Sequence, residues 1–162
     1  MNTPISQDIS IYESGSGGEI VIAGNDIALA EVLLQQAYLC MFGGNTEADT
    51  TGNEIDGVAR YDWWANSLIF ANDPAKQFNS QTERALANNA LNAAGRLNIL
   101  AAVNADLQNF NSIANITTNV VILSTNTVMI QVQLQMPGNS QNKTLQFIWD
   151  NARLEVITQV VI

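Results

Sequence analysis

The sequence predicts one α+β domain, in which an antiparallel β-sheet formed mainly by the C-terminal third packs on two principal helices, with a hairpin or short strands at the N-terminus. Three observations support this fold class. Apolar and polar residues alternate strictly over residues 127–136, as in a strand with one buried face. Two earlier segments carry apolar residues at helical spacing instead. The connections between the C-terminal segments are short, and short connections join antiparallel strands.

The N-terminal segment predicts short strands. Ile9 and Ile11 alternate as in a strand, a Gly- and Ser-rich stretch follows at residues 14–18, and apolar residues resume at residues 20–22. We therefore expect a hairpin or two short strands here. Residues 1–18 are also a candidate flexible arm.

Both helices have terminal signals. For the first helix, Asp26 stands at an N-cap position, and Gly43 with Gly44 supplies a C-terminal stop before the acidic loop of residues 45–57. The second helix begins at a capping box formed by Ser80 and Glu83, runs to about residue 101, and bends or breaks at Gly95. Residues 102–116 fit a frayed helix end and a loop.

The last third contains the strands of the predicted sheet. We expect strands at residues 119–124 and 127–136, then one in which Leu145, Phe147 and Trp149 alternate, and a final β-prone run at residues 154–162. Between the two helices stand Trp63 and Trp64, which cannot point the same way in regular structure. Either one enters the core while the other meets a neighbouring element or a partner, or both are core residues.

Composition favours a component of an assembly. The 162 residues suffice for one domain, residues 1–162, with its own core. Hydrophobic residues make up 47% and charged residues 13%, so much of the surface must be neutral and polar. Such a surface can hydrogen-bond to another chain without the desolvation cost of covering a charge.

The net charge of -9 is concentrated between residues 8 and 62, where Arg60 is the one basic residue. A basic partner surface and a solvated acidic face are both open interpretations. Lys and Arg are few and scattered, so we expect no nucleic-acid partner. The chain has no run of roughly 20 apolar residues and no basic or apolar leader at its start, so we expect a soluble protein in a reducing cytoplasm or in a particle that leaves it.

The residue types argue against catalysis. The chain has no histidine, which removes the usual general base and the commonest metal ligand, and Cys40 is the single cysteine. We expect no enzyme activity, no cofactor and no metal. The alternative is a small glycan-cleaving enzyme in which Glu54 or Asp56 works with Asp62, although their polar loop offers no evident apolar pocket to raise a pKa.

The order of features also resembles a known family. A strand leads through Gly24, Asn25 and Asp26 into a helix that ends in the sequence LCMFGG, and an acidic loop then precedes Asp62, Trp63 and Trp64. In this order the chain resembles the Mu-type phage baseplate proteins, which are similar to the tail sheath initiator of T-even phages and to its type VI secretion counterpart. This group is sometimes described as lysozyme-like. The resemblance runs from about residue 20 to residue 157, but the arginine that commonly follows the tryptophans is missing from Asn66-Ser67-Leu68.

The resemblance implies a structural subunit of a contractile-tail baseplate, present in six copies around the tail axis. Its partners would be the baseplate wedge proteins and the tail sheath, for which it initiates assembly, with the tail tube as a further candidate. It would reside in the virion tail baseplate, and in the host cytoplasm during assembly. A protein-binding module unrelated to phage remains an alternative.

Strand addition at an exposed sheet edge would supply the binding mechanism. The candidate edges are residues 127–136 and 154–162, and we favour the second because its apolar end would otherwise be exposed; ordinary internal pairing is the alternative for each. The interface residues expected on this basis are Trp63, Trp64, Gln131, Gln133, Gln135, Leu154, Val156, Val160 and Ile162.

Overall fold

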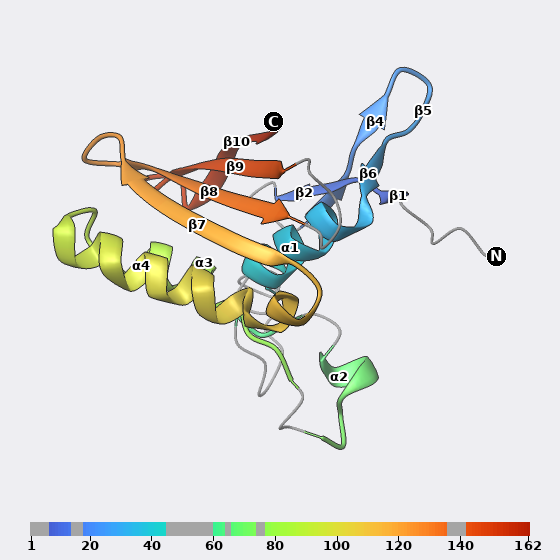
Figure 1. Cartoon of the computed structure of the whole chain (residues 1–162), viewed down its shortest axis with the longest axis horizontal. Coiled ribbons are helices and arrows are strands. Elements are labelled where there is room, and N and C mark those ends of the chain that lie inside the picture. Colours follow the sequence, from blue (N-terminus) through green and yellow to red (C-terminus); the bar gives the residue numbers. More distant parts are fainter. Residues whose placement is uncertain (1–6, 14–17, 45–59, 64–65, 74–76, 136–141) are drawn as a thin grey trace, which may run out of the picture.

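The computed structural model describes residues 7–13, 18–44, 60–63, 66–73, 77–135 and 142–162. Within these ranges the chain has an α+β fold, in which short paired strands at the N-terminus precede the helices and a four-stranded antiparallel sheet occupies the C-terminal part (Figure 1). The predicted fold class is therefore confirmed.

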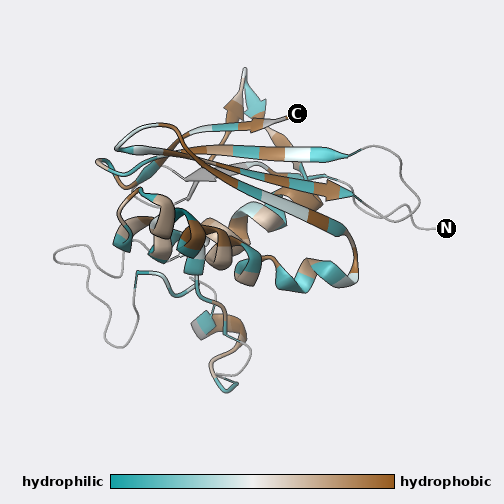
Figure 2. Ribbon diagram, turned by 60° about the vertical axis from the view of Figure 1, so that its left-hand side comes forward, coloured by the Kyte–Doolittle hydropathy of each residue, from teal (hydrophilic) through white to brown (hydrophobic). Residues whose placement is uncertain are grey.

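The C-terminal sheet is a simple meander. Its strands are β7 (Asn115–Ile122), β8 (Thr127–Gln135), β9 (Lys143–Asp150) and β10 (Glu155–Val161), and their spatial order is β10-β9-β8-β7. Every second side chain of the two central strands is buried, and these residues are Val128, Ile130, Val132, Leu134, Leu145, Phe147 and Trp149. The alternation seen in the sequence thus marks the face that packs on the helices (Figure 2).

The helices lie on one face of this sheet (Figures 1 and 2). They are α1 (Val32–Phe42), α3 (Gln81–Asn88) and α4 (Ala93–Asp106), and a 3-10 helix, η3 (Gln108–Ser112), continues from α4 towards β7. The short helix α2 (Asn66–Ile69) is set apart from the others.

Aromatic packing joins α1 to the sheet. The ring centroid of Phe42 lies 5.2 Å from that of Phe147 and 6.2 Å from that of Trp149, and Tyr38 lies 5.8 Å from Phe147. All four side chains are at most 3% exposed. Because aromatic side chains bury large apolar areas, this contact fixes the orientation of α1 under β9.

The first helix begins later than predicted. Asp26 is not its N-cap: it lies in a short strand, where its side-chain Oδ1 accepts the backbone N–H of Ile27 at 2.8 Å. The segment before Val32 is extended because it pairs with other N-terminal strands, and those hydrogen bonds replace a first helical turn.

The second predicted helix is two helices. It begins next to Ser80 as expected, but the Ser80 side chain makes no cap hydrogen bond. The break lies between Asn88 and Ala93 rather than at Gly95, because the Asn92 side chain accepts the backbone N–H of Gly95 at 2.9 Å and starts α4 there. Gly95 is needed for a different reason, since a Cβ at this position would clash with the Ala90 carbonyl.

The N-terminal strands form three two-stranded ladders, which together we call the three-armed module (residues 7–13 and 18–31). The pairs are β1 (Gln7–Ile9) with β6 (Leu29–Glu31), β2 (Ile11–Glu13) with β3 (Gly18–Ile20), and β4 (Ile22–Ala23) with β5 (Asp26–Ile27). The predicted hairpin corresponds to β2 and β3, whereas the other two ladders were not predicted. Residues 1–6 and 14–17 lie outside the described residues, so the flexible arm stays a prediction.

Replacing Phe147 by Ala tests the aromatic contact between α1 and β9. Phe147 is fully buried, so its truncation should lower the free energy of unfolding by about 3–5 kcal/mol in a urea titration. Leu97 on α4 is 55% exposed, and Leu97→Ala should change stability by less than about 0.5 kcal/mol. Equal effects of the two substitutions would contradict the packing described above.

Candidate functional site

The edge of the C-terminal sheet at β10 is one of two candidate interaction sites. Among the described residues, β10 pairs with β9 on one side and with no strand on the other. Strand β2 lies close to β10, but no backbone hydrogen bond joins them among the described residues. Among the described residues, a row of main-chain groups at this edge is therefore unpaired, which is the condition for the addition of a further strand.

The register identifies which main-chain groups these are. Ile162 and Thr144 exchange both backbone hydrogen bonds, at 2.8 and 2.9 Å. In an antiparallel ladder such pairs alternate with pairs that point their N–H and C=O groups away from each other. Val160 opposite Gln146 therefore belongs to the bonded pairs, whereas Gln159 and Val161 direct their backbone groups to the open edge.

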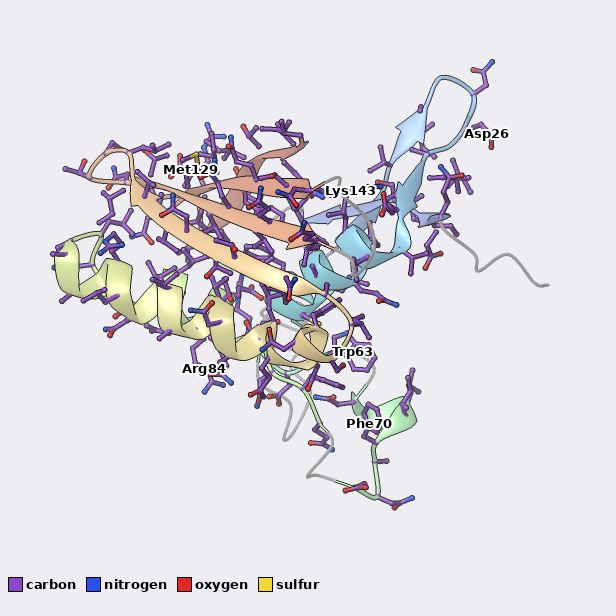
Figure 3. All side chains as sticks on the ribbon, in the orientation of Figure 1. Asp26, Trp63, Phe70, Arg84, Met129 and Lys143 are labelled. Carbon is purple, nitrogen blue, oxygen red and sulfur yellow. The ribbon has the colours of Figure 1, made fainter. Side chains whose placement is uncertain are left out.

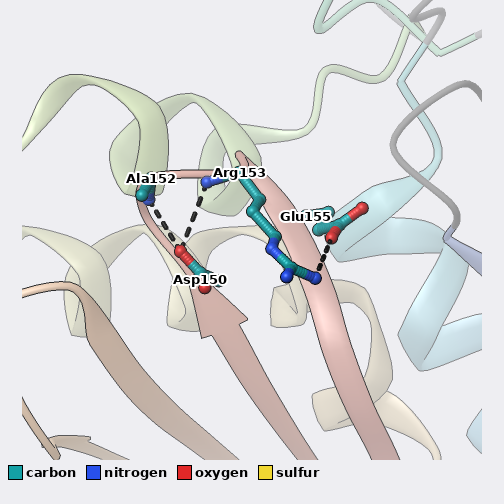
Figure 4. A network of polar contacts seen from close by, with 4 residues as sticks. All are labelled: Asp150, Ala152, Arg153 and Glu155. Atoms are coloured by element: carbon teal, nitrogen blue, oxygen red, sulfur yellow. Dashed lines mark hydrogen bonds and ion pairs between the residues drawn. The ribbon is translucent and has the colours of Figure 1, made fainter.

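The turn before β10 holds the strand in place (Figure 4). One oxygen of Asp150 accepts the backbone N–H groups of Ala152 at 2.8 Å and Arg153 at 3.2 Å, and the Arg153 guanidinium lies 3.4 Å from Glu155. Leu154 completes the turn with a φ of 56°, a conformation that non-glycine residues rarely adopt. Leu154 is thus a turn residue next to the edge rather than part of it.

The predicted edge at residues 127–136 is wrong. Strand β8 pairs with β7 on one side and with β9 on the other, so its main chain is fully used. Alternating hydrophobicity reveals which face of a strand is buried, but not whether the strand lies at the centre or at the edge of its sheet. The sequence pattern alone therefore could not identify the edge strand. The glutamine side chains are still placed together, on the face opposite the helices.

On that face, amide side chains form a row across the sheet. Asn119 donates to Gln131 at 3.3 Å, and Gln131 donates to Gln146 at 2.9 Å. Val160 stands opposite Gln146 and ends the row at the open edge. In the neighbouring row, Gln133 is opposite Thr144, which pairs with Ile162.

The structure therefore places Gln131, Gln133, Val160 and Ile162 on one face of the sheet, with Val160 and Ile162 at the β10 edge and the two glutamines on β8, beyond β9. Gln135 is the last residue of β8 and is opposite Asn115 of β7. Val156 lies on the helix-covered face instead, because it stands opposite the buried Trp149.

The second candidate site is an apolar cavity of about 420 Å³ beside Trp63, which we call the Trp63 pocket. Its lining comes from α1, the segment around Trp63, the segment before α3, and η3; the residues are Gln36, Leu39, Cys40, Trp63, Phe78, Asn79, Ser80, Asn109, Phe110 and Ile113. The centroids of the Trp63, Phe70 and Phe78 rings lie 5.8 to 6.4 Å apart. Figure 3 labels Trp63 and Phe70 of this cluster. The sequence singled out Trp63, but it gave no signal for its partners from distant segments.

Local contacts hold Trp63 at the mouth of this pocket. Its backbone N–H donates to the Phe78 carbonyl at 3.2 Å, and the Asn66 side chain bonds to both backbone groups of Phe78, at 2.6 and 3.0 Å. Arg60 forms an ion pair with the buried Glu83 of α3, at 3.4 Å. A Cβ added to Gly43 would lie 2.8 Å from the Trp63 ring, so only glycine leaves room for the indole.

A second, more polar cavity of about 410 Å³ shares Cys40 and Phe78 with the first and reaches Asp106. Burial, and then the nearby Asp106, raise the pKa of the Cys40 thiol to about 11, so the thiol is protonated at neutral pH and is a poor nucleophile. Burial also raises the pKa of Asp106 to about 6, although backbone N–H groups of Thr82 and Gln81, at 2.7 and 3.1 Å, oppose the shift. These two bonds cap the N-terminus of α3.

The remaining predicted residues are placed as follows. Trp64, Glu54 and Asp56 lie outside the described residues. Asp62 forms an isolated β-bridge with Asn79, beside the Trp63 pocket. Within the described part of the chain, no helix is long and apolar enough to cross a membrane.

The chain was compared with protein-family models, with curated proteins and with solved structures, and none of these comparisons gave a match.

The titration of Asp106 should appear in the pH dependence of stability. Its folded-state pKa of about 6 exceeds the ordinary value of 3.8, so between these values the folded chain holds a proton that the unfolded chain releases. Stability from this group should therefore rise as the pH falls through 6 and be lost as the pH rises again. Urea unfolding between pH 7 and pH 4 should show this rise in the wild type relative to Asp106→Asn. A difference that stays constant across this range would contradict it.

Proposed function

We propose that the chain is a structural subunit of a contractile-tail baseplate, which binds wedge proteins and initiates sheath assembly without catalysing a reaction. The observation that carries the proposal is the open β10 edge, where Gln159 and Val161 direct outward main-chain groups that pair with no other described residue. An extended arm of a neighbouring subunit would add there as a fifth strand. Its further partners would be the tail sheath proteins, with the tail tube proteins as an additional candidate, in an assembly of six copies. The resemblance of residues 20–157 to baseplate proteins supports these partners.

A further feature supports strand addition at this edge. Ile157, Val160 and Ile162 are 44, 40 and 71% exposed, so a partner that covers this edge also removes apolar surface from water.

The Trp63 pocket would give the second contact. A cavity of about 420 Å³ lined by Phe78, Phe110 and Ile113 suits a large apolar side chain of the partner, and such anchors contribute much of the energy of protein interfaces. Main-chain pairing at β10 would then set the direction of the arm, while the pocket would bind an apolar side chain from another part of the partner.

Genes on either side of this one give the first test. Tail genes on both sides fit the proposal, whereas their absence favours a binding module unrelated to phage. Turnover of peptidoglycan by the purified chain, lost in Asp62→Asn, would favour the glycan-cleaving alternative and overturn the proposal.

Proline at position 159 tests strand addition. The Gln159 N–H points away from β9, so Gln159→Pro should leave the sheet folded but remove a donor from the open edge and clash with an added strand. Co-expressed with its tail proteins, this variant should enter baseplates at less than a tenth of the wild-type level in electron micrographs. Gln159→Ala, which keeps the N–H, should enter normally. Normal incorporation of a folded Gln159→Pro chain would refute strand addition at β10.

A charge at the mouth of the Trp63 pocket tests the second contact. Ile113 lines the pocket and is 46% exposed, so Ile113→Lys should preserve the fold and weaken binding of the co-expressed tail partner about tenfold or more. The control is Leu97→Lys, at a site of 55% exposure that is not part of the pocket. If both variants bind the partner as the wild type does, the pocket is not an interface.

A further inference from the structure

The three-armed module is held together by a ring of backbone hydrogen bonds at its centre. Ser10 donates to the Ala28 carbonyl at 2.8 Å, Ala28 donates to the Val21 carbonyl at 2.9 Å, and Val21 donates to the Ser10 carbonyl at 3.0 Å. Each of these residues is the single connection between two ladders, so the ring joins all three arms. The chain thereby builds a defined platform from strands of two or three residues each.

Apolar residues flank every member of this ring. Ile9 pairs with Leu29 and Ile22 pairs with Ile27, directly opposite each other across their ladders, and Ile20 stands next to Val21. Because side chains alternate along an extended chain, residues on both sides of a ring residue share the face opposite to it. The module thus presents an apolar face around its centre, while Ser10, Val21 and Ala28 point the other way and are half-buried.

This face is exposed in the isolated chain. The apolar face consists of Ile9, Ile20, Ile22, Ile27 and Leu29, whose exposed fractions are 40, 51, 63, 44 and 59%. Monomeric proteins seldom leave large apolar side chains grouped in this way, and contiguous patches of this kind mark interaction surfaces. In Figure 1 the β4 and β5 hairpin projects away from the sheet and the helices, where a partner can reach it.

The charges of the module restrict the partner. Its acidic residues are Asp8, Glu13, Glu19, Asp26 and Glu31, and residues 7–31 contain no Lys or Arg. Lys143 of β9 forms an ion pair with Glu31 and so anchors the module to the sheet. Figure 3 labels Lys143, and Asp26 at the tip of the β4 and β5 hairpin. Asp8 and Asp26 adjoin Ile9 and Ile27 in the sequence. A uniformly acidic segment favours the approach of a basic chain, even where its carboxylates point to the other face of the ladders.

Two kinds of occupant are disfavoured by these charges. A second copy would bring two acidic modules together, and like-charge juxtaposition opposes such a contact. An anionic membrane surface would be repelled for the same reason.

We propose that the apolar face of the three-armed module binds a segment of a different protein that has apolar side chains flanked by Lys or Arg. The negative charge of the N-terminal half then attracts this partner, in addition to forming a solvated acidic surface. The apolar face contains no residue of the β10 edge or of the Trp63 pocket, so the proposal does not depend on the function proposed for them.

Labelled synthetic peptides test the proposal directly on the full chain. The probe is a ten-residue peptide that alternates Val and Lys, and the matched probes carry Gln or Glu in place of Lys. Fluorescence anisotropy should give a dissociation constant at least tenfold lower for the Lys peptide than for the Glu peptide. Raising the salt concentration should weaken the binding.

The double variant Ile22→Ser and Leu29→Ser separates the apolar face from simple charge attraction. It removes the two most exposed residues of the face and keeps every carboxylate, so it should fold normally by circular dichroism and bind the Lys peptide at least tenfold more weakly. Leu97→Ser on α4 is the matched control and should bind as the wild type does.

Three results would overturn the proposal. The first is equal binding of the Lys peptide to the wild type and the double variant, which would reduce the interaction to charge alone. The second is the absence of any binding. The third is a dimer in sedimentation that the double variant abolishes, because the occupant would then be a second copy.

Discussion

The packing of α1 under β9 is the contact on which the other features depend. Tyr38 and Phe42 meet Phe147 and Trp149 in the most deeply buried part of the molecule. One end of α1 continues from the three-armed module, and the other ends at Gly43, beside the Trp63 ring. The same aromatic contact therefore positions the sheet, the module and the pocket relative to one another.

The sequence predicted the sheet well because a strand with one buried face has alternating apolar and polar residues. Strand β8 was predicted at residues 127–136 and observed at Thr127–Gln135, with Val128 and Ile130 facing the helices. The same pattern contains no information about neighbours on either side of a strand, so β8 was wrongly considered an edge. The final run, by contrast, was correctly expected to be a strand and lies at the edge of the sheet.

The N-terminal module and the Trp63 pocket were less predictable because they depend on contacts between distant residues. Strands as short as Ile22–Ala23 are too short to show a period, and only the hydrogen bonds around Ser10 specify how they join. The pocket combines Trp63 with Phe78 and Phe110, and no spacing in the sequence relates these three. The predicted cap of α3 also depends on a distant residue. The Asp106 carboxylate caps this helix in place of the Ser80 side chain.

Strand addition requires that β10 leave main-chain groups unpaired in the free chain, and amide hydrogen exchange followed by NMR measures this most directly. We expect the amides of Gln159 and Val161 to exchange rapidly in the isolated chain, and that of Val160, bonded to β9, to be protected. Strong protection of Gln159 and Val161 in the isolated chain would mean that the edge is already filled and that no further strand can add there.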